Sequence, residues 1–299
     1  MIPFIIDETI LPIPENSAAV FGNRETVPCV TVGGCGRFSV AKTFDCGQAF
    51  RFDPVNETTF AGTAFDRPVA FEQTGDGMIT VYNSTAEDFE HLWLRYLALD
   101  TDYDAIDQFL IDAMPNERDR AVMSAAVEAG RGIRILRQDP FEALISFIVS
   151  QNNNIPRIKK IIRTLCQTYG VDGRFPTAQA LVDAGEDGLF ALKTGFRAGY
   201  IHDAARKIVS GEIRIDDLLA CDDYTTCDTE LRKIRGVGPK VSACVLLYGF
   251  GKTEAFPVDV WIKKSLARHF PDGFDVKSLG KYAGIAQQYL FYYERYING

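Results

Sequence analysis

Two residues of this 299-residue chain, Lys240 and Asp259, have the types and the setting that covalent chemistry requires. Lys240 follows Gly-Val-Gly-Pro at 236–239, so the spacing predicts a helix that carries the Lys in its first turn. Asp259 follows a Pro-Val pair at the predicted start of another helix. The unpaired N–H groups at a helix N-terminus bind phosphate, and an amine beside a carboxylate suits attack on a carbon that becomes cationic. The pattern therefore indicates an enzyme that acts on nucleic acid.

The chemistry of an amine nucleophile explains why the two residues belong together. An amine must be uncharged when it attacks, and a helix N-terminus and partial burial both disfavour the ammonium form. Attack of Lys240 on C1′ of a nucleotide would give a Schiff base after loss of the base, and strand cleavage by β-elimination would follow. Asp259 would stabilise the cationic transition state. Each residue alone also fits an ordinary helix start or N-cap, but their combined spacing favours catalysis.

Length and composition are those of a soluble globular protein with two or more subdomains. No apolar run approaches the roughly 18 residues of a membrane span, and the N-terminus lacks the features of a secretory signal. The seven cysteines are odd in number and irregularly spaced, which is typical of a reducing compartment. We therefore expect no membrane association and an intracellular location, in the cytoplasm or nucleoid of a bacterium or the nucleus of a eukaryote.

The net charge of −8 is distributed unevenly along the chain. Residues 1–130 contain 8 Lys and Arg against 21 Asp and Glu, whereas residues 131–214 contain 13 against 8. Residues 215–299 balance at 11 against 11. Because steering depends on the local potential, the basic middle segment is compatible with binding a phosphate backbone. By charge alone, a solvated basic surface is the better explanation.

Hydrophobic patterning divides the chain into strands followed by helices. Apolar and β-branched runs between turn residues predict strands at 28–32, 37–41, 49–52, 59–63, 69–71 and 78–82. From residue 86 onward, helical periodicity and start signals predict helices that include 155–169, 200–209, 223–233, 239–248, 257–270 and 277–296. We therefore predict an α+β fold, with an N-terminal antiparallel β domain over residues 1–84 and a helical domain over 85–299. A helix-hairpin-helix is expected at about 223–249.

The segments Gly-Val-Gly-Pro-Lys-Val at 236–241 and Phe-Pro-Val-Asp-Val at 256–260 resemble the helix-hairpin-helix/Gly-Pro-Asp motif of DNA base-excision glycosylases. More narrowly, the chain resembles the bifunctional 8-oxoguanine DNA glycosylases over most of its length. Further similar stretches are Cys-Gly-Gln-Ala-Phe-Arg at 46–51, Leu-Arg-Gln-Asp-Pro-Phe at 136–141, the segment 147–155 and Tyr-Ala-Gly-Ile-Ala-Gln at 282–287. The resemblance implies a β domain like the TATA-binding protein and a C-terminal helix packed near a base pocket.

The resemblance implies catalytic and base-binding roles for particular residues. Lys240 would be the Schiff-base nucleophile, Asp259 its catalytic carboxylate, and Cys244 the partner of the Lys beneath the base. Gly47 would direct its C=O at the N7–H that 8-oxoguanine has and guanine lacks. Without the resemblance, Gly47 fits a turn before a strand and Cys244 fits a core position.

Gln287 and Phe291 lie four residues apart and share one face of the last predicted helix. By resemblance, Phe291 would stack on the flipped base and Gln287 would bond its Watson–Crick edge. The alternative is an aromatic core stripe, because Tyr282, Tyr289, Tyr292 and Tyr293 lie in the same helix.

Two polar turns between apolar helices contain the residues that the resemblance places opposite the lesion. Asn152, Arg157 and Arg197 would bind the cytosine left behind by flipping, while Phe196 would wedge into the base stack. Taken without the resemblance, these residues fit turn formers and surface charge.

The hairpin itself would grip the DNA backbone. The resemblance implies phosphate binding by Gly236, Gly238 and Val241, and a monovalent cation held by the backbone carbonyls of Ile234 and Val237. The three His form no metal-ligand pattern and no Cys follows residue 244, so we expect no catalytic metal, no iron–sulfur cluster near the C-terminus and no cofactor.

Three positions depart from the family pattern. Trp261 stands where a His usually follows the catalytic Asp, which puts a phosphate or pocket contact in doubt. Phe196 replaces a more usual Tyr, and Arg235 stands where Pro is common in the hairpin.

Together these features predict a monomeric DNA glycosylase with lyase activity that removes 8-oxoguanine, opposite cytosine, from double-stranded DNA. One alternative keeps the fold but acts on another damaged purine, such as an alkylated one. Another is a non-catalytic module that binds DNA structure, which would have no need of a nucleophile, a carboxylate and a base pocket together.

Overall fold

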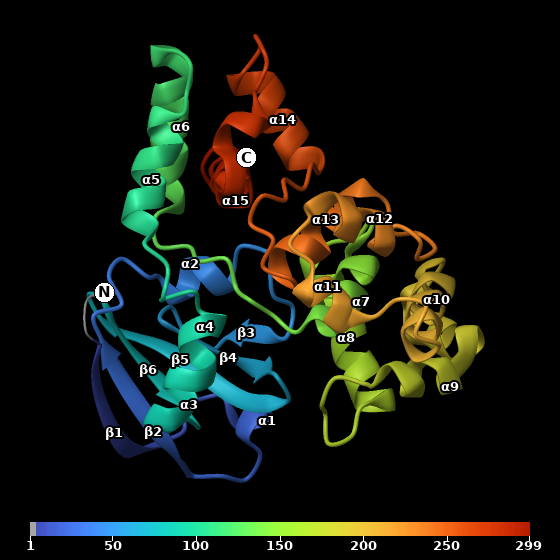
Figure 1. The fold of residues 1–299 in the computed structure, drawn as a ribbon. Coiled ribbons are helices and arrows are strands. Elements are labelled where there is room, and N and C mark those ends of the chain that lie inside the picture. Colours follow the sequence, from blue (N-terminus) through green and yellow to red (C-terminus); the bar gives the residue numbers. More distant parts are fainter. Residues whose placement is uncertain (1–3) are drawn as a thin grey trace. The chain divides into compact units, whose positions relative to one another are not determined.

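The computed structural model describes residues 4–299 and separates the chain into two compact units (Figure 1). Unit 1 comprises Met1–Arg137 and Val260–Gly299, and unit 2 comprises Gln138–Asp259. The change from strands to helices follows strand β6, and helices from both ends of the chain belong to unit 1. The domain boundaries expected from the sequence, a β domain over 1–84 and a helical domain over 85–299, remain a prediction.

Unit 1 contains one antiparallel sheet with the strand order β1-β2-β6-β5-β4-β3. Its strands are β1 (Ile5–Pro12), β2 (Thr26–Gly33), β3 (Phe52–Pro54), β4 (Thr59–Ala64), β5 (Arg67–Gly75) and β6 (Met78–Tyr82). The sheet follows the period-two rule for side chains. Val30 and Phe71 lie in the larger core cluster, whereas Cys29 and Ala70, one position away, lie in the smaller one. The N-terminal antiparallel sheet predicted from the sequence is confirmed.

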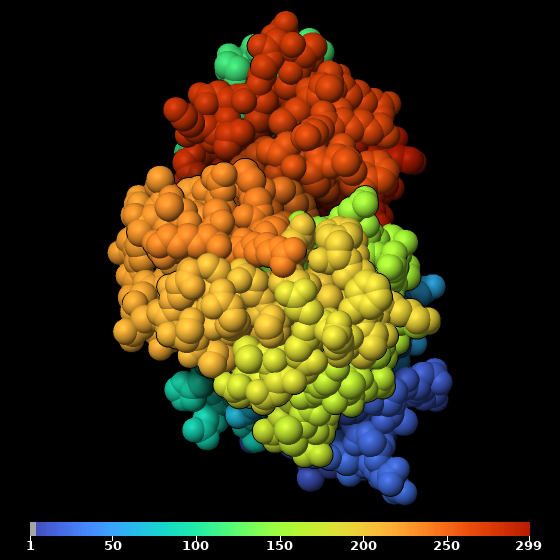
Figure 2. Space-filling view, turned by 90° about the vertical axis from the view of Figure 1, so that its right-hand side faces the viewer, coloured from blue at the N-terminus to red at the C-terminus, as the bar shows by residue number. Residues whose placement is uncertain are grey.

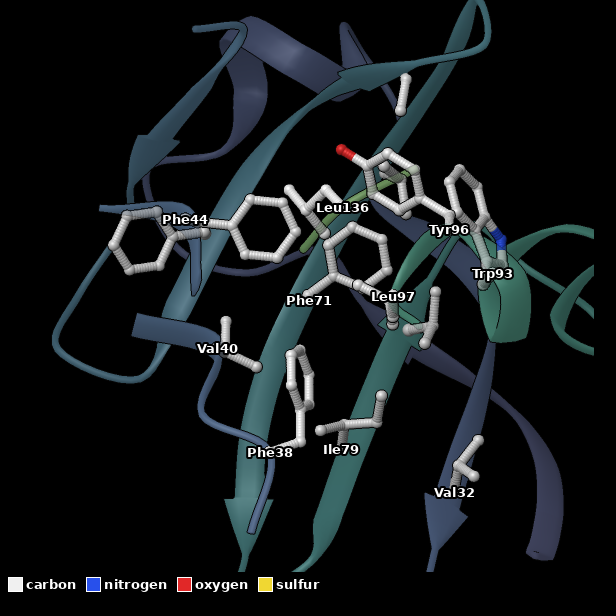
Figure 3. Packing of buried hydrophobic residues seen from close by; sticks show 14 of the residues in the cluster. Val32, Phe38, Val40, Phe44, Phe71, Ile79, Trp93, Tyr96, Leu97 and Leu136 are labelled. Carbon is white, nitrogen blue, oxygen red and sulfur yellow. The ribbon is translucent and has the colours of Figure 1, made fainter. Parts of the chain in front are cut away.

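The larger core cluster of unit 1 is dominated by aromatic rings (Figure 3). Phe44 stacks on Phe71 with ring centroids 5.1 Å apart, and Trp93 meets the edge of Phe71 at 5.4 Å. Tyr96 packs against Trp93 at 5.8 Å. Because such rings each bury a large apolar area, this cluster fixes the short helices of unit 1 on the sheet.

Three sequence expectations about the strands of unit 1 differ from the structure. The strand predicted at 49–52 begins only at Phe52, as β3. The segment 37–41 is not a strand: Gly34 and Gly36 adopt positive φ and turn the chain, and helix α2 (Val40–Phe44) begins after Ser39. The Ser39 side chain caps this helix by accepting from the Lys42 N–H at 3.3 Å. Strand β1 was missed because its residues are mostly exposed, so no alternation of apolar side chains marks it; pairing with β2 holds it.

The remaining helices of unit 1 come from both ends of the chain. They are α1 (Ala18–Phe21), α3 (Ala86–Asp88), η1 (Phe89–Trp93), α4 (Leu94–Tyr96), α5 (Tyr103–Asp112), α6 (Glu117–Gly130), α14 (Val260–His269), η3 (Val276–Tyr282), α15 (Ala283–Tyr292) and η4 (Tyr293–Ile297). The helix expected at 277–296 is thus divided into three, because Gly280 has non-helical dihedrals and the last turns widen. Buried Tyr289 anchors α15 by donating to Asp107 of α5 at 2.9 Å.

Unit 2 is entirely helical, and Figure 2 shows its segments, coloured yellow-green to orange, packed against one another. Its helices are α7 (Pro140–Ser150), α8 (Ile155–Tyr169), α9 (Ala178–Leu189), η2 (Phe190–Thr194), α10 (Arg197–Val209), α11 (Ile215–Ala220), α12 (Tyr224–Leu231) and α13 (Pro239–Tyr248). The bounds predicted for α8 and α13 are confirmed. Over residues 4–299, no helix has the length and apolar character to cross a membrane.

Candidate active site

The predicted helix-hairpin-helix is formed by α12, a turn and α13 in unit 2. Asp223 caps α12 by accepting from the Thr226 N–H at 2.7 Å. In contrast, α13 begins at Gly238 and Pro239 without any side chain that caps its first turn. The N–H groups of the first turn of α13 therefore have no side-chain acceptor, and with the positive end of the helix dipole they can bind an external anion.

Gly236 and Gly238 are glycines for different reasons. Gly236 has φ +80°, and a Cβ there would lie 2.2 Å from the ring of Tyr200, so the fold of unit 2 itself requires glycine. Gly238 has φ −94°, which any residue adopts, and a Cβ there would meet nothing within 4 Å. Nothing within unit 2 explains the glycine at 238, whereas close approach of an external backbone would.

This contrast predicts opposite effects of two alanine substitutions. Gly236→Ala should lower the free energy of unfolding by about 1–3 kcal/mol through strain and the clash with Tyr200. Gly238→Ala should leave it within about 0.5 kcal/mol of the parent and should weaken binding to duplex DNA. Thermal melting and a DNA titration measure the two quantities, and equal DNA affinity of Gly238→Ala and the parent would contradict the prediction.

Lys240, Cys244 and Asp259 converge in unit 2. Lys240 lies in the first turn of α13 and is near enough to lower the pKa of the Cys244 thiol, which is one turn further along. Burial raises the pKa of Cys244, Lys240 opposes this rise, and the charge of Asp259 adds to it. Both the amine and the carboxylate therefore act on the same buried thiol, which keeps its proton at neutral pH.

An aromatic ring completes the surroundings of the amine. The Lys240 Nζ lies 5.8 Å from the ring centroid of Phe147, and Phe147 stacks on Tyr248 at 5.2 Å. Phe147 comes from α7 and Tyr248 from the end of α13, so two helices form the apolar side of the amine's environment. The Lys240 amine therefore lies over an aromatic face on this side, within an apolar part of unit 2.

Lys42 of unit 1 is an amine whose environment disfavours the charged form. Burial lowers its pKa, with Glu128 opposing this effect. However, its Nζ donates to the backbone carbonyls of Ala129 and Arg131 at 2.9 and 3.2 Å. Through these bonds the Lys42 amine stabilises the C-terminal end of α6. We therefore interpret Lys42 as a structural residue and not as an alternative nucleophile.

The loop that carries Gly47 is fixed from both sides within unit 1. Gly47 has φ +81°, a conformation that favours glycine. The next residue, Gln48, is fully buried and bonds the carbonyl oxygens of Thr43 and Arg134 at 3.0 and 2.8 Å. On the other side, Gln288 of α15 donates to the Cys46 carbonyl at 3.4 Å. A backbone carbonyl in this loop is thus held by the fold rather than free to adjust.

Gln287 and Phe291 lie on the same helix as Gln288, as predicted. The Gln287 side chain is 4% exposed, yet its Oε1 atom has no hydrogen-bond partner within the described residues. A buried amide oxygen without a partner costs free energy in the unliganded protein, about 1–3 kcal/mol. Phe291 is partly exposed and lies 5.5 Å from the guanidinium of Arg295. An orphaned acceptor beside a partly exposed ring is an arrangement that a planar polar ligand would complete.

Unit 2 brings together the four residues predicted to lie opposite the lesion. Arg197 is 3% exposed, and its guanidinium donates to the carbonyls of Gln151 and Asn152, at 2.9 Å from Nε and 3.0 Å from Nη2. The Thr194 carbonyl, at 3.1 Å from Nη1, is the third carbonyl that this guanidinium binds. Burial lowers the pKa of Arg197, and the charge of Arg157 lowers it further. In this structure, Arg197 clamps the two polar turns together, so direct base reading by its guanidinium stays a prediction.

The other two residues of this group are accessible. Phe196 is 56% exposed and immediately precedes α10. Its ring centroid lies 5.7 Å from that of Tyr200 and 4.4 Å from the guanidinium carbon of Arg197. Arg157 is exposed, and its Nη2 atom makes one long contact, 3.4 Å, with the Lys193 carbonyl. An exposed ring and an exposed guanidinium on neighbouring turns have the features that insertion into a base stack requires.

Two of the departures from the family pattern have structural partners. The Arg235 N–H donates to Asp203 at 2.8 Å, and its guanidinium lies 5.7 Å from the ring of Tyr200. Trp261 packs its ring 5.1 Å from the Lys264 ammonium. Arg235 therefore stabilises the hairpin against α10 without a Pro.

The predicted cation site at the hairpin stays a prediction. The Ile234 carbonyl accepts from the Val237 N–H at 3.0 Å and closes the turn. Within residues 4–299, no group of three or more His, Cys, Asp or Glu side chains has the arrangement of a metal site.

Three functional neighbours were not anticipated from the sequence. Gln48 and Gln288 fix the Gly47 loop, and Phe147 lies beside Lys240. The signal for Gln48 was a polar residue inside an otherwise apolar run, which predicts a buried, fully bonded side chain. Gln288 and Phe147 gave no such signal, because helix periodicity does not reveal contacts over long sequence separations.

Comparison with known proteins assigns the chain to a family. Residues 35–144 match the N-terminal domain of 8-oxoguanine DNA glycosylase, and residues 145–275 match the HhH-GPD superfamily of base excision DNA repair proteins. The N-glycosylase/DNA lyase OGG1 of Arabidopsis thaliana is 30% identical over 288 residues, covering 83% of this chain and 75% of the relative. This chain belongs to the 8-oxoguanine DNA glycosylase family.

A solved structure agrees with this assignment over nearly the whole chain. The 8-oxoguanine glycosylase/lyase of Clostridium acetobutylicum, in complex with double-stranded DNA containing cytosine opposite 8-oxoguanine, has a TM-score of 0.81 and 36% identity. The match covers 91% of this chain and 96% of the other. The N-glycosylase/DNA lyase of Saccharomyces cerevisiae is 37% identical over 159 residues, 47% of this chain and 42% of the relative.

Family membership confirms three predictions made from the sequence. The resemblance to 8-oxoguanine DNA glycosylases is confirmed, as is the α+β fold with a helix-hairpin-helix body. The enzyme class, N-glycosylase with DNA lyase activity in base excision repair, is confirmed as well. The roles of individual residues remain predictions, although the structure gives each of them defined surroundings.

Proposed function

We propose that this glycosylase removes 8-oxoguanine paired with cytosine from duplex DNA by flipping the base, forming a Schiff base at Lys240 and cleaving the strand by β-elimination. The observation that carries the proposal is the convergence of Lys240 and Asp259 on the Cys244 thiol, in the first turn of a helix with an open N-terminus. An amine, a carboxylate and a phosphate grip in one segment of unit 2 suit attack on a nucleotide sugar.

The reaction balances with Lys240 as nucleophile. Its Nζ bonds to C1′ while the C1′–N9 bond breaks, and the electron pair leaves with the base, which takes up a proton. Opening of the sugar at O4′ then gives the iminium, whose positive charge acidifies the C2′ hydrogen. Loss of that proton expels the 3′ phosphate, and water releases the enzyme. Asp259 stabilises the positive charge that develops at C1′ and takes part in the proton transfers.

Recognition of the oxidised base is assigned to unit 1. The Gly47 carbonyl accepts from N7–H of 8-oxoguanine, whereas the unprotonated N7 of guanine leaves that carbonyl unpaired at a cost of about 1–3 kcal/mol. The rigid loop around Gly47 supports this discrimination, because it does not relax to relieve the mismatch. The unpaired Oε1 of Gln287 and the partly exposed ring of Phe291 support binding of a flipped planar base.

The two polar turns of unit 2 are assigned to the opposite strand. Phe196 fills the space that the flipped nucleotide leaves, and Asn152 and Arg157 bond the unpaired cytosine. The exposure of Phe196 and Arg157 supports this role. The related Clostridium acetobutylicum enzyme, solved with cytosine opposite 8-oxoguanine, supports cytosine as the partner base. The phosphate of the cleaved strand is assigned to the start of α13, at Gly238 and Val241.

Base release from a panel of duplexes tests the proposal. We expect fastest release from 8-oxoguanine opposite cytosine, slower release opposite adenine, and none from guanine opposite cytosine. Arg157→Ala should reduce the preference for cytosine while overall DNA affinity changes by less than about tenfold, since one contact is lost. High-performance liquid chromatography of the freed base measures both quantities.

Other outcomes separate the alternatives. Release of an alkylated purine but not of 8-oxoguanine would favour the same fold acting on another lesion. Binding of every duplex without release from any would favour a non-catalytic module. An unchanged preference for cytosine in Arg157→Ala would remove that residue from the assignment.

A further inference from the structure

The seven cysteines differ sharply in accessibility, and all of them lie within residues 4–299. Six are buried, and Cys221 alone is partly exposed. Burial raises the pKa of Cys35 and Cys46 to about 12, which leaves those thiols protonated and inert. A dissolved oxidant can therefore reach the Cys221 thiol more readily than the six buried thiols.

Cys221 is placed against a second thiol by the start of α12. It lies two residues before Asp223, the N-cap, and Cys227 lies at the fourth position of the helix. The chain entering a helix folds back over the first turn, as in a hydrophobic staple. The Cys227 Sγ atom accordingly lies 3.7 Å from the Cys221 carbonyl oxygen, and the Cys221 side chain is close enough to raise the pKa of Cys227.

A cation lies beside the pair. The Lys252 ammonium donates to the Cys221 carbonyl oxygen. Burial, followed by the nearby Cys221 side chain, raises the pKa of Cys227 to about 11, and Lys252 opposes this rise. Cys227 is thus the less reactive, protected sulfur, while Cys221 is the sulfur that solvent reaches.

We propose that Cys221 and Cys227 form a reversible oxidation site, in which a peroxide oxidises Cys221 and Cys227 then closes an intramolecular disulfide. The Cys221 thiolate attacks one peroxide oxygen and the O–O bond breaks, giving a sulfenic acid and water. The Cys227 sulfur displaces the hydroxyl group as a second water and forms the S–S bond. The two thiols lose two electrons and two protons to the peroxide, and a small dithiol reverses the reaction.

The location of the pair limits what its oxidation does. Both sulfurs lie at the N-terminal end of α12, whereas the hairpin turn follows the C-terminal end of that helix. The bond would therefore form without altering the turn, and it would consume oxidant before the buried Cys244 beside Lys240 is reached. This inference does not depend on the substrate proposed above, because it concerns thiols that the reaction does not use.

Treatment of the full chain with dilute hydrogen peroxide, followed by alkylation and peptide mass spectrometry, tests the proposal. We expect the tryptic peptide 215–232, which contains both cysteines, to become about 2 Da lighter than its reduced form and to be restored by dithiothreitol, while the other five cysteines stay alkylatable. Cys227→Ala should instead leave a sulfenic acid at Cys221 that dimedone traps. Cys221→Ser should slow thiol loss at least tenfold, whereas Cys166→Ser, a buried control, should oxidise like the parent.

Three results would overturn the proposal. One is a disulfide that joins two chains rather than these residues. Another is equal oxidation of all seven thiols. The third is dimedone labelling of Cys221 in the parent as strong as in Cys227→Ala, since a resolving thiol must remove the sulfenic acid. Melting curves of each variant before oxidation establish that the fold is retained.

Discussion

Lys240→Gln abolishes the covalent adduct that borohydride traps between the protein and a duplex containing 8-oxoguanine opposite cytosine. Glutamine keeps most of the side-chain length and its apolar stem but lacks a nucleophilic amine, so no Schiff base forms. We expect no adduct above background and a fall in base release of about 10³-fold or more, the scale seen when a covalent nucleophile is removed. Denaturing electrophoresis after borohydride treatment measures the adduct.

Two lysines serve as controls for this experiment. Lys281 is exposed over Tyr282, and Lys281→Gln should trap as the parent does. Lys42→Gln tests an amine of unit 1 whose pKa burial lowers, and it should also trap once melting shows that it folds. Trapping by Lys240→Gln, or its loss in folded Lys42→Gln, would assign the nucleophile to a different residue.

Asp259→Asn has the second largest expected effect. The amide has the same shape as the carboxylate but no negative charge, so it stabilises the cationic transition state less and accepts no proton. We expect base release to slow by about 10²–10³-fold while affinity for the duplex changes little, because the charge acts mainly in the transition state. Single-turnover kinetics with enzyme in excess separates these two quantities.

Asp272→Asn is the matched control, because this carboxylate is 90% exposed and forms an ion pair with Arg118 at 3.5 Å. It should react like the parent. If Asp259→Asn instead lost DNA affinity in proportion to rate, the carboxylate would have a binding or folding role, and the assignment of its catalytic role would fail.

The architecture separates the proposed tasks between the two compact units. Residues of unit 2 supply the amine, the carboxylate, the hairpin and the turns that hold Phe196. Residues of unit 1 supply the Gly47 loop and the helix with Gln287 and Phe291. Because each group is held by contacts inside its own unit, substitutions in one group should change base choice without changing the chemistry of the other.

Much of the hairpin was determined by local sequence. Glycine and proline act through their own backbone dihedrals, so Gly236, Gly238 and Pro239 set the turn and the start of α13 without help from distant residues. The helix predicted at 239–248 has those bounds in the structure, with Lys240 in its first turn. For the same reason α8, which starts after the Asn154 cap and has Pro at its second position, was predicted with its observed bounds.

Long-range contacts decided what the sequence left open. The segment 37–41 has the composition of a strand, yet the Ser39 N–H donates to the Gly132 carbonyl at 2.9 Å and the Val40 N–H donates to Oε1 of Gln73 at 3.1 Å, where a helix begins. Strand β1 has no apolar alternation and exists through its pairing with β2. Arg197 has the composition of a surface charge, and only the packed turns around it commit its guanidinium to three backbone carbonyls.

The sequence by itself determined which residues could do the chemistry and where each lies locally. Lys240 is in the first turn of a helix that follows a glycine hairpin, and Asp259 is at the start of a later helix. Only the tertiary structure decided that Lys240 and Asp259 act on the same Cys244 thiol, and that Gln287 has an unpaired acceptor. The physical reason is range: backbone preferences act over a few residues, whereas burial and charge act between residues that only folding brings together.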